Sequence, residues 1–342
     1  MVDAQITPEK SDQKKADLVL EGGGVKGIGL VGAVTTLSSS GYTFPRVAGT
    51  SAGAIAGALV AACMATGKNV SVITDIMTNV DYTKFRDETP LGHLGLLGEG
   101  AELLMGRGIY KGDYLLTWLG GQLDNLGVKT FGDLRISDQD DPGSALPENE
   151  RYRLVVMASD VTSGQLARLP WDCRAHYDMD PDALPIVDAV RASMSIPFFY
   201  KPYVLPGTKA TFVDGGMLAN FPVEIFDRPD GESRWPTFGV KLSARPKPGA
   251  TMQPTSNTLQ LAIACLETLV DEHDAYHLDD DRTTQRTIFV DTTGVSATNF
   301  DIDKQTQQTL FANGQAAAKL FLGSWPPATW TAEGKWLGHP QR

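Results

Sequence analysis

A serine between two glycines constrains the fold of this chain more than any other feature. Residues 49–53 read Gly-Thr-Ser-Ala-Gly, the G-x-S-x-G spacing in which a serine occupies a tight turn between a strand and a helix. The turn requires neighbours with almost no side chain, and Gly49 and Gly53 meet that requirement. Small apolar residues follow, as in a helix buried on all sides whose N-terminus points at Ser51. The stretch predicts a nucleophilic serine, with an ordinary turn as the alternative.

A glycine-rich loop lies upstream of the serine, between a short strand expected at residues 16–21 and a helix expected from Ile28. Its sequence, Gly-Gly-Gly-Val-Lys-Gly at residues 22–27, permits three interpretations. A dinucleotide-binding loop would need an acidic residue about 20 positions further on, and none is present there. A P-loop would need Ser or Thr directly after the lysine, where this chain has Gly27. An oxyanion hole is the third interpretation.

The order of the two loops favours the oxyanion hole. If the strands that precede them are neighbours in a parallel sheet, both loops lie at one edge of that sheet. Backbone N–H groups of the first loop would then face an acyl carbonyl held at Ser51 and stabilise its developing negative charge. The candidate donors are Gly22, Gly23, Gly24 and Val25.

Asp214 is the candidate general base. It ends an apolar strand expected at residues 210–214 and precedes two glycines, a context in which an aspartate often only forms a turn. The five histidines are His93, His176, His273, His277 and His339. None of them lies in the strand-to-loop context of a hydrolase triad. His273 and His277 share a helix face, but their acidic neighbours favour a solvated helix end over a metal site. A serine nucleophile needs a base, and Asp214 is therefore preferred.

The remaining apolar runs predict the scaffold. Residues 151–160 are expected to form a core strand with a hairpin partner at 165–170, and a helix is expected at 186–195. Three aromatic residues after that helix either pack in the core or line an acyl pocket: Phe198, Phe199 and Tyr200. The last expected elements are strands at 237–242 and 286–291 and helices at 256–276 and 303–321.

The segment at about 67–128 differs in composition from the rest of the chain. Within residues 92–108, glycines interrupt apolar residues more often than in a packed helix. We interpret this stretch as an apolar cap that covers the pocket in water and spreads onto lipid through Leu96, Leu97 and Leu104. The alternative is a short helix with loops that pack normally on the core.

Composition limits the partners of the protein. The chain has 342 residues, of which 42% are apolar and 21% charged, as in an ordinary globular protein with a large core. Its formal net charge of −11 disfavours nucleic acid and steady docking on anionic lipid, because both would repel it. Any lipid contact is therefore expected to be apolar or locally basic.

Cysteine spacing and the N-terminal segment indicate a reducing compartment. Cys63, Cys173 and Cys265 are odd in number and lack C-x-x-C spacing, so neither a disulfide framework nor a zinc site is expected. Residues 1–17 contain no apolar run of signal-peptide length, and no stretch of about 18 apolar residues occurs in the chain. A cytoplasmic location is expected, with peripheral membrane contact and signal-independent secretion left open.

Four sequence blocks together resemble the patatin-like phospholipases, lipid acyl hydrolases that use a Ser-Asp dyad. They match the family's oxyanion loop, nucleophile elbow, serine-proline block and catalytic aspartate motif in order and spacing. The blocks are Gly22–Gly27, Gly49–Gly53, Arg191–Pro197 and Asp214–Gly216. The resemblance implies a three-layer α/β/α fold around a central, mostly parallel sheet. One catalytic domain is expected at residues 16–325, including the cap-like insertion. A flexible leader at 1–15 and a tail at 326–342 fall outside it.

The resemblance also implies a mechanism. Asp214 would take the proton of Ser51 as the serine oxygen attacks an ester carbonyl, and water would later release the acyl group. An ordinary aspartate is a weak base with a pKa of about 4, so an apolar acyl pocket is expected to raise that pKa. No metal or cofactor is needed for this scheme.

The substrate class follows from the same resemblance. The expected substrate is a glycerophospholipid, cleaved as by a phospholipase A or lysophospholipase at a transient membrane or micelle surface. A neutral acylglycerol lipase and a transacylase are alternatives that use the same dyad. A nucleotide-binding module that uses residues 22–27 is a more distant alternative.

Overall fold

The computed structural model describes residues 14–87, 108–137, 146–228, 235–242 and 281–327, together with residues 255, 261–262, 264–265 and 268–269. The predicted cap leucines Leu96, Leu97 and Leu104 lie outside these residues. So do most of the predicted leader, most of the predicted tail and most of the helix predicted at 256–276.

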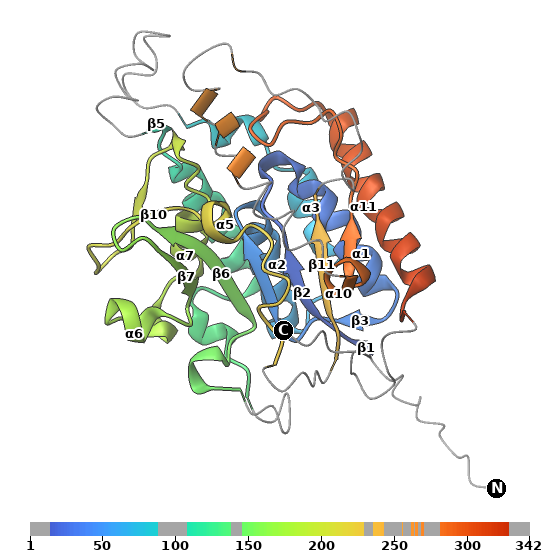
Figure 1. The fold of residues 1–342 in the computed structure, drawn as a ribbon, viewed down its shortest axis with the longest axis horizontal. Coiled ribbons are helices and arrows are strands. Elements are labelled where there is room, and N and C mark those ends of the chain that lie inside the picture. Colours follow the sequence, from blue (N-terminus) through green and yellow to red (C-terminus); the bar gives the residue numbers. More distant parts are fainter. Residues whose placement is uncertain are drawn as a thin grey trace, which may run out of the picture.

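An eight-stranded mixed sheet forms the centre of the described fold (Figure 1). Its strands are β2 (Asp17–Leu20), β4 (Val47–Thr50), β6 (Leu154–Asp160), β7 (Gln165–Leu169), β9 (Tyr203–Val204), β10 (Thr211–Asp214), β11 (Thr237–Lys241) and β12 (Thr287–Phe289). The order is β12-β11-β2-β4-β6-β10-β9, and β7 also pairs with β6. The strands from β12 to β6 run parallel, whereas β7, β10 and β9 join through antiparallel pairs. The predicted α/β class is confirmed, with a parallel half and an antiparallel half.

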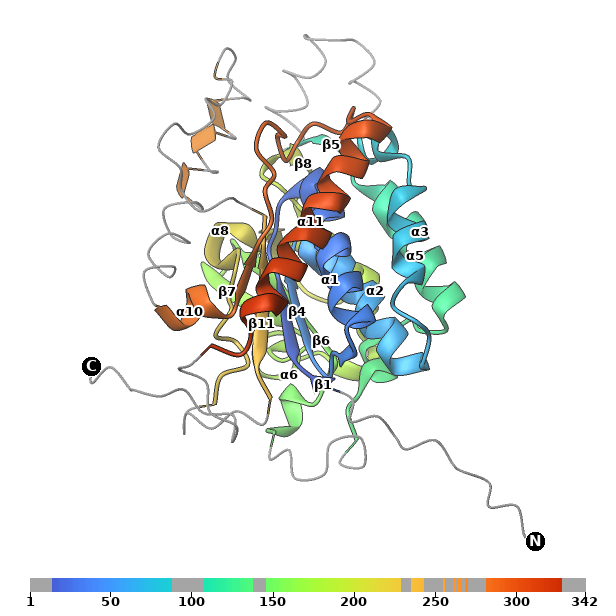
Figure 2. The same cartoon turned by 90° about the vertical axis from the view of Figure 1, so that its right-hand side faces the viewer.

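Helices flank this sheet on both sides. Figure 2 shows α1, α2, α5 and α11 on one side of the sheet and α8 and α10 on the other. Their bounds are α1 (Ile28–Ser39), α2 (Ala52–Thr66), α5 (Asp113–Leu126), α8 (Gly216–Ala219), α10 (Asp281–Gln285) and α11 (Lys304–Ser324). α2 contacts β2, β4 and β6 of the sheet and the helices α5 and α7 (Ile186–Ser193), and its residues 52–63 are buried. An apolar sequence without a polar face is what such an enclosed position requires.

The shorter elements complete the described part of the chain. β1 (Lys14–Lys15) pairs with β3 (Tyr42–Thr43), and β5 (Gly108–Tyr110) pairs with β8 (Phe198–Tyr200). The short helices are α3 (Val72–Thr78) and α6 (Cys173–Tyr177), with 3₁₀ turns at Gly24–Gly27, Tyr82–Phe85, Phe131–Leu134, Glu148–Glu150 and Pro181–Ala183. None of the helices in the described ranges is long and apolar enough to cross a bilayer.

Several sequence predictions of individual elements are confirmed to within a few residues. The predicted hairpin is the antiparallel pair β6–β7, and the helix predicted at 186–195 is α7. The last strand and the last helix are β12 and α11. The carboxylate of Asp303 accepts a hydrogen bond from the Thr306 amide at 2.7 Å and so caps the N-terminus of α11.

The two strands that carry the candidate dyad share one edge of β6, because β7 occupies the other edge. β4 runs parallel to β6 and ends with Thr50 opposite Met157. β10 arrives antiparallel from the other direction and ends with Asp214 opposite Ala158. The ends of β4 and β10 therefore meet at adjacent residues of β6, which brings Ser51 and Asp214 together.

Candidate active site

Ser51 occupies a strained turn between β4 and α2. Its backbone has φ +51° and ψ −119°, and a non-glycine residue in such a sparsely populated conformation costs about 1–3 kcal/mol. Packing requires both flanking glycines. A Cβ on Gly49 would collide with the backbone of Gly53, and a Cβ on Gly53 would collide with the carbonyl oxygen of Leu20. The G-x-S-x-G pattern thus corresponds here to a strand-turn-helix in which no larger residue fits beside the serine.

Hydrogen bonds from two other elements hold this turn. The Ser51 amide donates to the Ser193 hydroxyl at 2.8 Å, and Ser193 is fully buried at the end of α7. The Thr50 hydroxyl donates to the carbonyl of Ala219 at 2.9 Å, at the end of α8. Ser193 belongs to the serine-proline block, for which no role was predicted from the sequence. Its contact with the candidate nucleophile explains why a hydroxyl is useful at that position.

Asp214 is anchored at the end of β10 by three hydrogen bonds. Its amide donates to the carbonyl of Ser195 at 2.9 Å, and its carbonyl accepts from the Ser159 hydroxyl at 2.9 Å. Its carboxylate oxygen Oδ1 accepts from the Gly216 amide at 2.8 Å. The other oxygen, Oδ2, is buried and has no hydrogen-bond partner among the described residues. An unpartnered buried carboxylate oxygen is costly, and it remains available to accept a proton.

Burial changes the basicity of this carboxylate. It raises the pKa of Asp214 to about 6, and interaction with the Ser51 hydroxyl and the hydrogen bond from Gly216 lower the pKa in part. The Ser51 side chain therefore lies close enough to act directly on the carboxylate. No hydrogen bond of normal geometry joins the two side chains, as is common before a substrate closes a catalytic contact.

Two of the four candidate oxyanion donors are occupied by other acceptors. The Gly22 amide donates to the carbonyl of Asn220 at 3.4 Å, and the Val25 amide donates to the carbonyl of Ala297 at 3.1 Å. In this conformation they fix the path of the loop.

The amides of Gly23 and Gly24 make no hydrogen bond to any described residue. Gly24 has φ +54°, a left-handed conformation that favours glycine. The loop lies against the serine turn, since a Cβ on Gly22 would be 3.2 Å from the Ser51 Cβ. The Ala52 amide is the first of α2 and has no intrahelical acceptor. Ala52 was not among the donors predicted from the sequence, although the residue after an elbow nucleophile supplies such a donor.

Comparison with known proteins identifies the family. The family model for patatin-like phospholipases matches residues 18–227. The chain belongs to this family. Protein YqhO of Bacillus subtilis (strain 168) is 37% identical over 316 residues, which cover 90% of this chain and 98% of YqhO. Protein R571 of Acanthamoeba polyphaga mimivirus is 23% identical over 222 residues, 65% of each chain. The crystal structure of VipD from Legionella pneumophila shares the fold, with a TM-score of 0.51 and 20% identity over 92% of this chain and 67% of VipD.

Membership of the patatin-like phospholipases makes this protein a lipid hydrolase at the level of the family. Three of the blocks that carried the resemblance meet around Ser51 in the structure. They are the glycine loop, the block that contains Ser193 and the block that contains Asp214. The roles assigned to the individual residues remain predictions.

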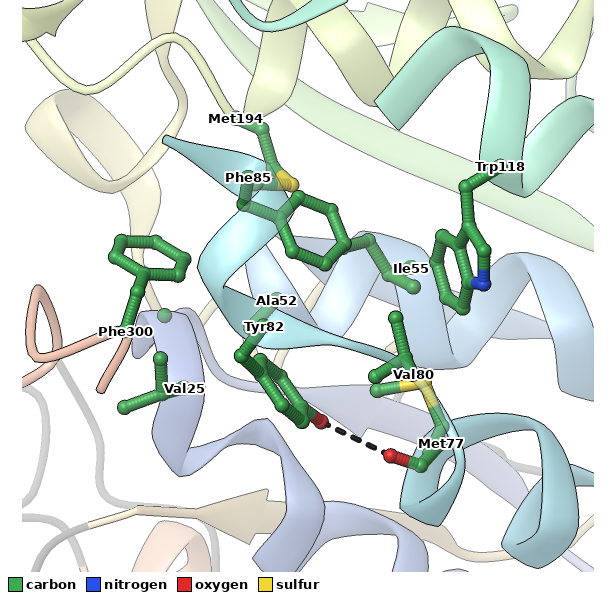
Figure 3. A pocket seen from close by; sticks show the side chains of 11 residues that line it. Val25, Ala52, Ile55, Met77, Val80, Tyr82, Phe85, Trp118, Met194 and Phe300 are labelled. Atoms are coloured by element: carbon green, nitrogen blue, oxygen red, sulfur yellow. Dashed lines mark hydrogen bonds between the residues drawn. The ribbon is translucent and has the colours of Figure 1, made fainter. Parts of the chain in front are cut away.

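An apolar pocket adjoins the serine turn of this patatin-like protein (Figure 3). Its empty space, including the open mouth, is about 380 Å³. The lining residues are Gly24, Val25, Ala52, Ile55, Met77, Val80, Tyr82, Phe85, Trp118, Met194 and Phe300. Four of them belong to the sequence blocks: Gly24 and Val25 to the glycine loop, Ala52 to the elbow and Met194 to the serine-proline block. The pocket is therefore continuous with the candidate site.

The aromatic residues predicted after α7 do not line this pocket. Phe199 and Tyr200 are buried and lie behind Phe300, whose ring stacks on that of Phe199 at a centroid distance of 5.4 Å. For these two residues the core alternative is the correct one. Phe198 is 43% exposed and so belongs to neither alternative. Phe300, from a distant part of the chain, lines the pocket in their place.

A buried ion pair fixes the start of the glycine loop. Glu21 follows β2, and its Oε1 accepts hydrogen bonds from Lys241 Nζ and from Asn220 Nδ2. Its Oε2 accepts from the Leu242 amide. Glu21 and Lys241 are each about 95% buried, so the loop is tied to β11 and to the segment after Asp214. No sequence motif points to these residues, because they lie far apart in the chain.

The described histidine does not take part in the site. His176 is exposed on α6, where its ring contacts Tyr177. His93, His273, His277 and His339 lie outside the described residues.

Proposed function

We propose that this protein is a serine esterase that cleaves the carboxylic esters of glycerophospholipids, as a phospholipase A or lysophospholipase, through Ser51 and Asp214. The observation that carries the proposal is the buried, unpartnered Oδ2 of Asp214, whose carboxylate lies close enough to Ser51 for the hydroxyl to lower its pKa. Family membership supplies the lipid class of the substrate.

The proposed acylation step uses the geometry of the turn. Ser51 Oγ attacks the ester carbonyl carbon while its proton passes to Asp214 Oδ2. The carbonyl oxygen becomes an oxyanion and receives hydrogen bonds from the free amides of Gly23, Gly24 and Ala52. As the tetrahedral intermediate collapses, the proton on Asp214 passes to the departing alcohol oxygen. The lysolipid leaves, and the acyl group remains on Ser51.

Deacylation repeats the same proton transfers with water. A water molecule gives its proton to Asp214 and attacks the acyl carbonyl, and Ser51 Oγ leaves with that proton. The fatty acid is released and the carboxylate is regenerated. A pKa of about 6 suits this double role, because the group is mostly ionised at neutral pH but accepts a proton more readily than an exposed aspartate.

We further propose that the enzyme works in the cytoplasm at the surface of lipid aggregates. The acidic net charge and the apolar pocket beside the elbow support this mode of lipid contact. Contact with lipid would then be apolar and transient.

Product analysis from mixed vesicles tests the proposed function. Purified protein is incubated with vesicles of phosphatidylcholine, phosphatidylethanolamine and triacylglycerol, and the products are identified by mass spectrometry. The expected products are lysophospholipid and fatty acid. Ser51→Ala should abolish them and also abolish labelling by a fluorophosphonate probe, whereas Ser39→Ala, at an exposed serine of α1, should change neither. Release of diacylglycerol alone, or labelling that persists in Ser51→Ala, would contradict the proposal.

A further inference from the structure

The pocket beside the elbow has two ends. All of its lining residues are buried except Gly24 and Trp118, which are partly exposed. Gly24 belongs to the glycine loop at the candidate oxyanion hole, and Trp118 lies on α5. Figure 3 shows Val25 and Phe300 on one side of Ala52, and Trp118 on the side of Ile55 and Val80. The pocket therefore extends along the first turn of α2, from the oxyanion loop to Trp118.

The walls between these ends are apolar and interlocked. Phe85 packs edge-on against Trp118 at a centroid distance of 5.6 Å and lies against Tyr82 at 6.1 Å and Phe300 at 6.1 Å. The Tyr82 hydroxyl donates to the carbonyl of Met77 at 3.2 Å, so the polar atom of this residue is occupied. Rings held by several neighbours resist displacement, and they give the pocket a fixed length.

We propose that Trp118 closes the far end of the acyl pocket and limits the length of the acyl chain that the enzyme cleaves efficiently. The inference rests on the proposed esterase function, because the chain must start at the ester carbon held by Ser51. A chain that enters beside Gly24 passes Ala52 and Ile55 and meets the indole. Trp118 is the partly exposed residue at this end of the pocket.

Chain-length dependence follows from burial of methylene groups. Each additional buried methylene raises kcat/KM about fourfold, until the chain reaches the indole and the gain ends. Replacing Trp118 by alanine opens this end, so longer chains continue to gain. Val80 is 5% exposed and lines the same end of the pocket. A larger side chain at this position shortens the pocket.

A series of p-nitrophenyl esters from butyrate to palmitate measures the length of the pocket. The readout is the ratio of kcat/KM for palmitate to that for butyrate, which is independent of any general loss of active protein. Trp118→Ala should raise this ratio about fifteenfold, roughly the gain from two further methylene groups. Val80→Phe should lower it about tenfold. The control is Trp171→Ala, a buried tryptophan outside the pocket that packs on Phe226, and it should leave the ratio unchanged. An unchanged ratio in both pocket variants overturns the inference.

A binding measurement separates this inference from the proposed function. Fatty acids of the same chain lengths are titrated calorimetrically into Ser51→Ala, with and without Trp118→Ala, so that no turnover is needed. Affinity should stop increasing with chain length in the first protein and continue to increase in the second. If the parent protein is labelled by fluorophosphonate at Ser51 but fatty-acid affinity does not depend on chain length, the esterase proposal stands and Trp118 does not limit chain length. If binding depends on chain length but the parent protein is neither labelled nor active on esters, the role of Trp118 stands and the esterase proposal fails.

Discussion

Ser51 and Asp214 approach each other from opposite directions along a single edge of β6. The residue before Ser51 pairs with Met157, and Asp214 pairs with Ala158, the next residue of the same strand. Side chains placed by strand pairing are held more precisely than side chains on loops. The spacing between nucleophile and base is therefore set by the register of two strands on a third, within the buried part of the sheet.

Removing the charge of Asp214 should remove turnover. Asp214→Asn keeps an acceptor for the Gly216 amide but cannot take the proton of Ser51, so kcat should fall by about a thousandfold. Steady-state hydrolysis of a soluble short-chain ester measures this loss. Replacement of all five histidines together is the comparison, and it should leave the rate within about tenfold. A thousandfold loss from any one histidine would instead restore a histidine triad.

Local sequence signals were sufficient for the parts of the site that depend on local geometry. The turn at Ser51 needs small neighbours, and the glycine loop needs bare amides, so both leave a pattern that can be read in a few consecutive residues. The interpretation of the glycine loop required its strand and that of Ser51 to be parallel neighbours, and β2 and β4 are parallel neighbours in the sheet.

Long-range pairing left no comparable signal. The antiparallel pairing of β10 with β6 depends on which edge of β6 is unoccupied. The sequence of β10 does not indicate which edge that is. The contact between Glu21 and Lys241 and the occupation of the Val25 amide by Ala297 likewise join distant parts of the chain. Phe198 looked apolar enough to be buried, yet its backbone has φ +68° and its side chain is 43% exposed.

Activity should depend on the ionisation of Asp214. Burial raises its pKa to about 6, and the base must be ionised before Ser51 attacks. On a neutral ester, kcat/KM should be constant above about pH 7 and fall about tenfold per unit below about pH 5. A pH profile of kcat/KM with stability controls at each pH provides the test. A rate that stays constant from about pH 7 down to about pH 4 would show that a group with a normal carboxylate pKa, or none, is the base.

Ionisation of Asp214 should have opposite effects on activity and on folding stability: activity should rise with pH, and folding stability should fall. Because the folded-state pKa of Asp214 lies above the unfolded value of 3.8, the protonated form is favoured in the native state. Its contribution to stability is fully present below about pH 4 and is lost as pH rises through about 6. Asp214→Asn, which is neutral at every pH, should therefore be more stable than the parent at pH 8 by about 2–3 kcal/mol. Chemical denaturation of both proteins at pH 4 and pH 8 measures this, and an equal difference at the two values would contradict it.

The glycine requirement at the elbow can be tested with a matched glycine elsewhere. In Gly53→Ala the new methyl would collide with the carbonyl oxygen of Leu20, so the turn at Ser51 must shift, at a cost of about 1–3 kcal/mol in stability and a larger loss in turnover. Gly121 lies in the interior of α5, where a Cβ would meet no atom within 4 Å. Gly121→Ala should be stabilising by about 0.5–1 kcal/mol with unchanged turnover. Thermal unfolding and ester hydrolysis report both quantities, and similar behaviour of the two variants would refute the packing argument.

The ion pair behind the glycine loop should affect turnover separately from stability. Glu21→Leu removes the carboxylate that the buried Lys241 ammonium contacts, which should cost about 3–5 kcal/mol. Glu21→Leu with Lys241→Met replaces both charges by apolar groups, so much of this stability should return. The glycine loop would still lack the hydrogen bonds that Glu21 accepts from Asn220 and Leu242. Turnover in the double variant should therefore stay about tenfold below the parent.

The opposite end of the same strand offers the control for that experiment. Asp17 begins β2 and accepts a hydrogen bond from Arg46 at 3.0 Å, a second ion pair with a buried carboxylate. Asp17→Leu with Arg46→Met makes the same kind of replacement at the end of β2 away from the glycine loop, so turnover per folded molecule should match the parent. A fluorophosphonate titration of active sites, combined with urea denaturation, corrects each rate for the folded fraction. If the two double variants lose turnover equally, Glu21 stabilises the sheet as any buried ion pair would, and it does not position the oxyanion loop.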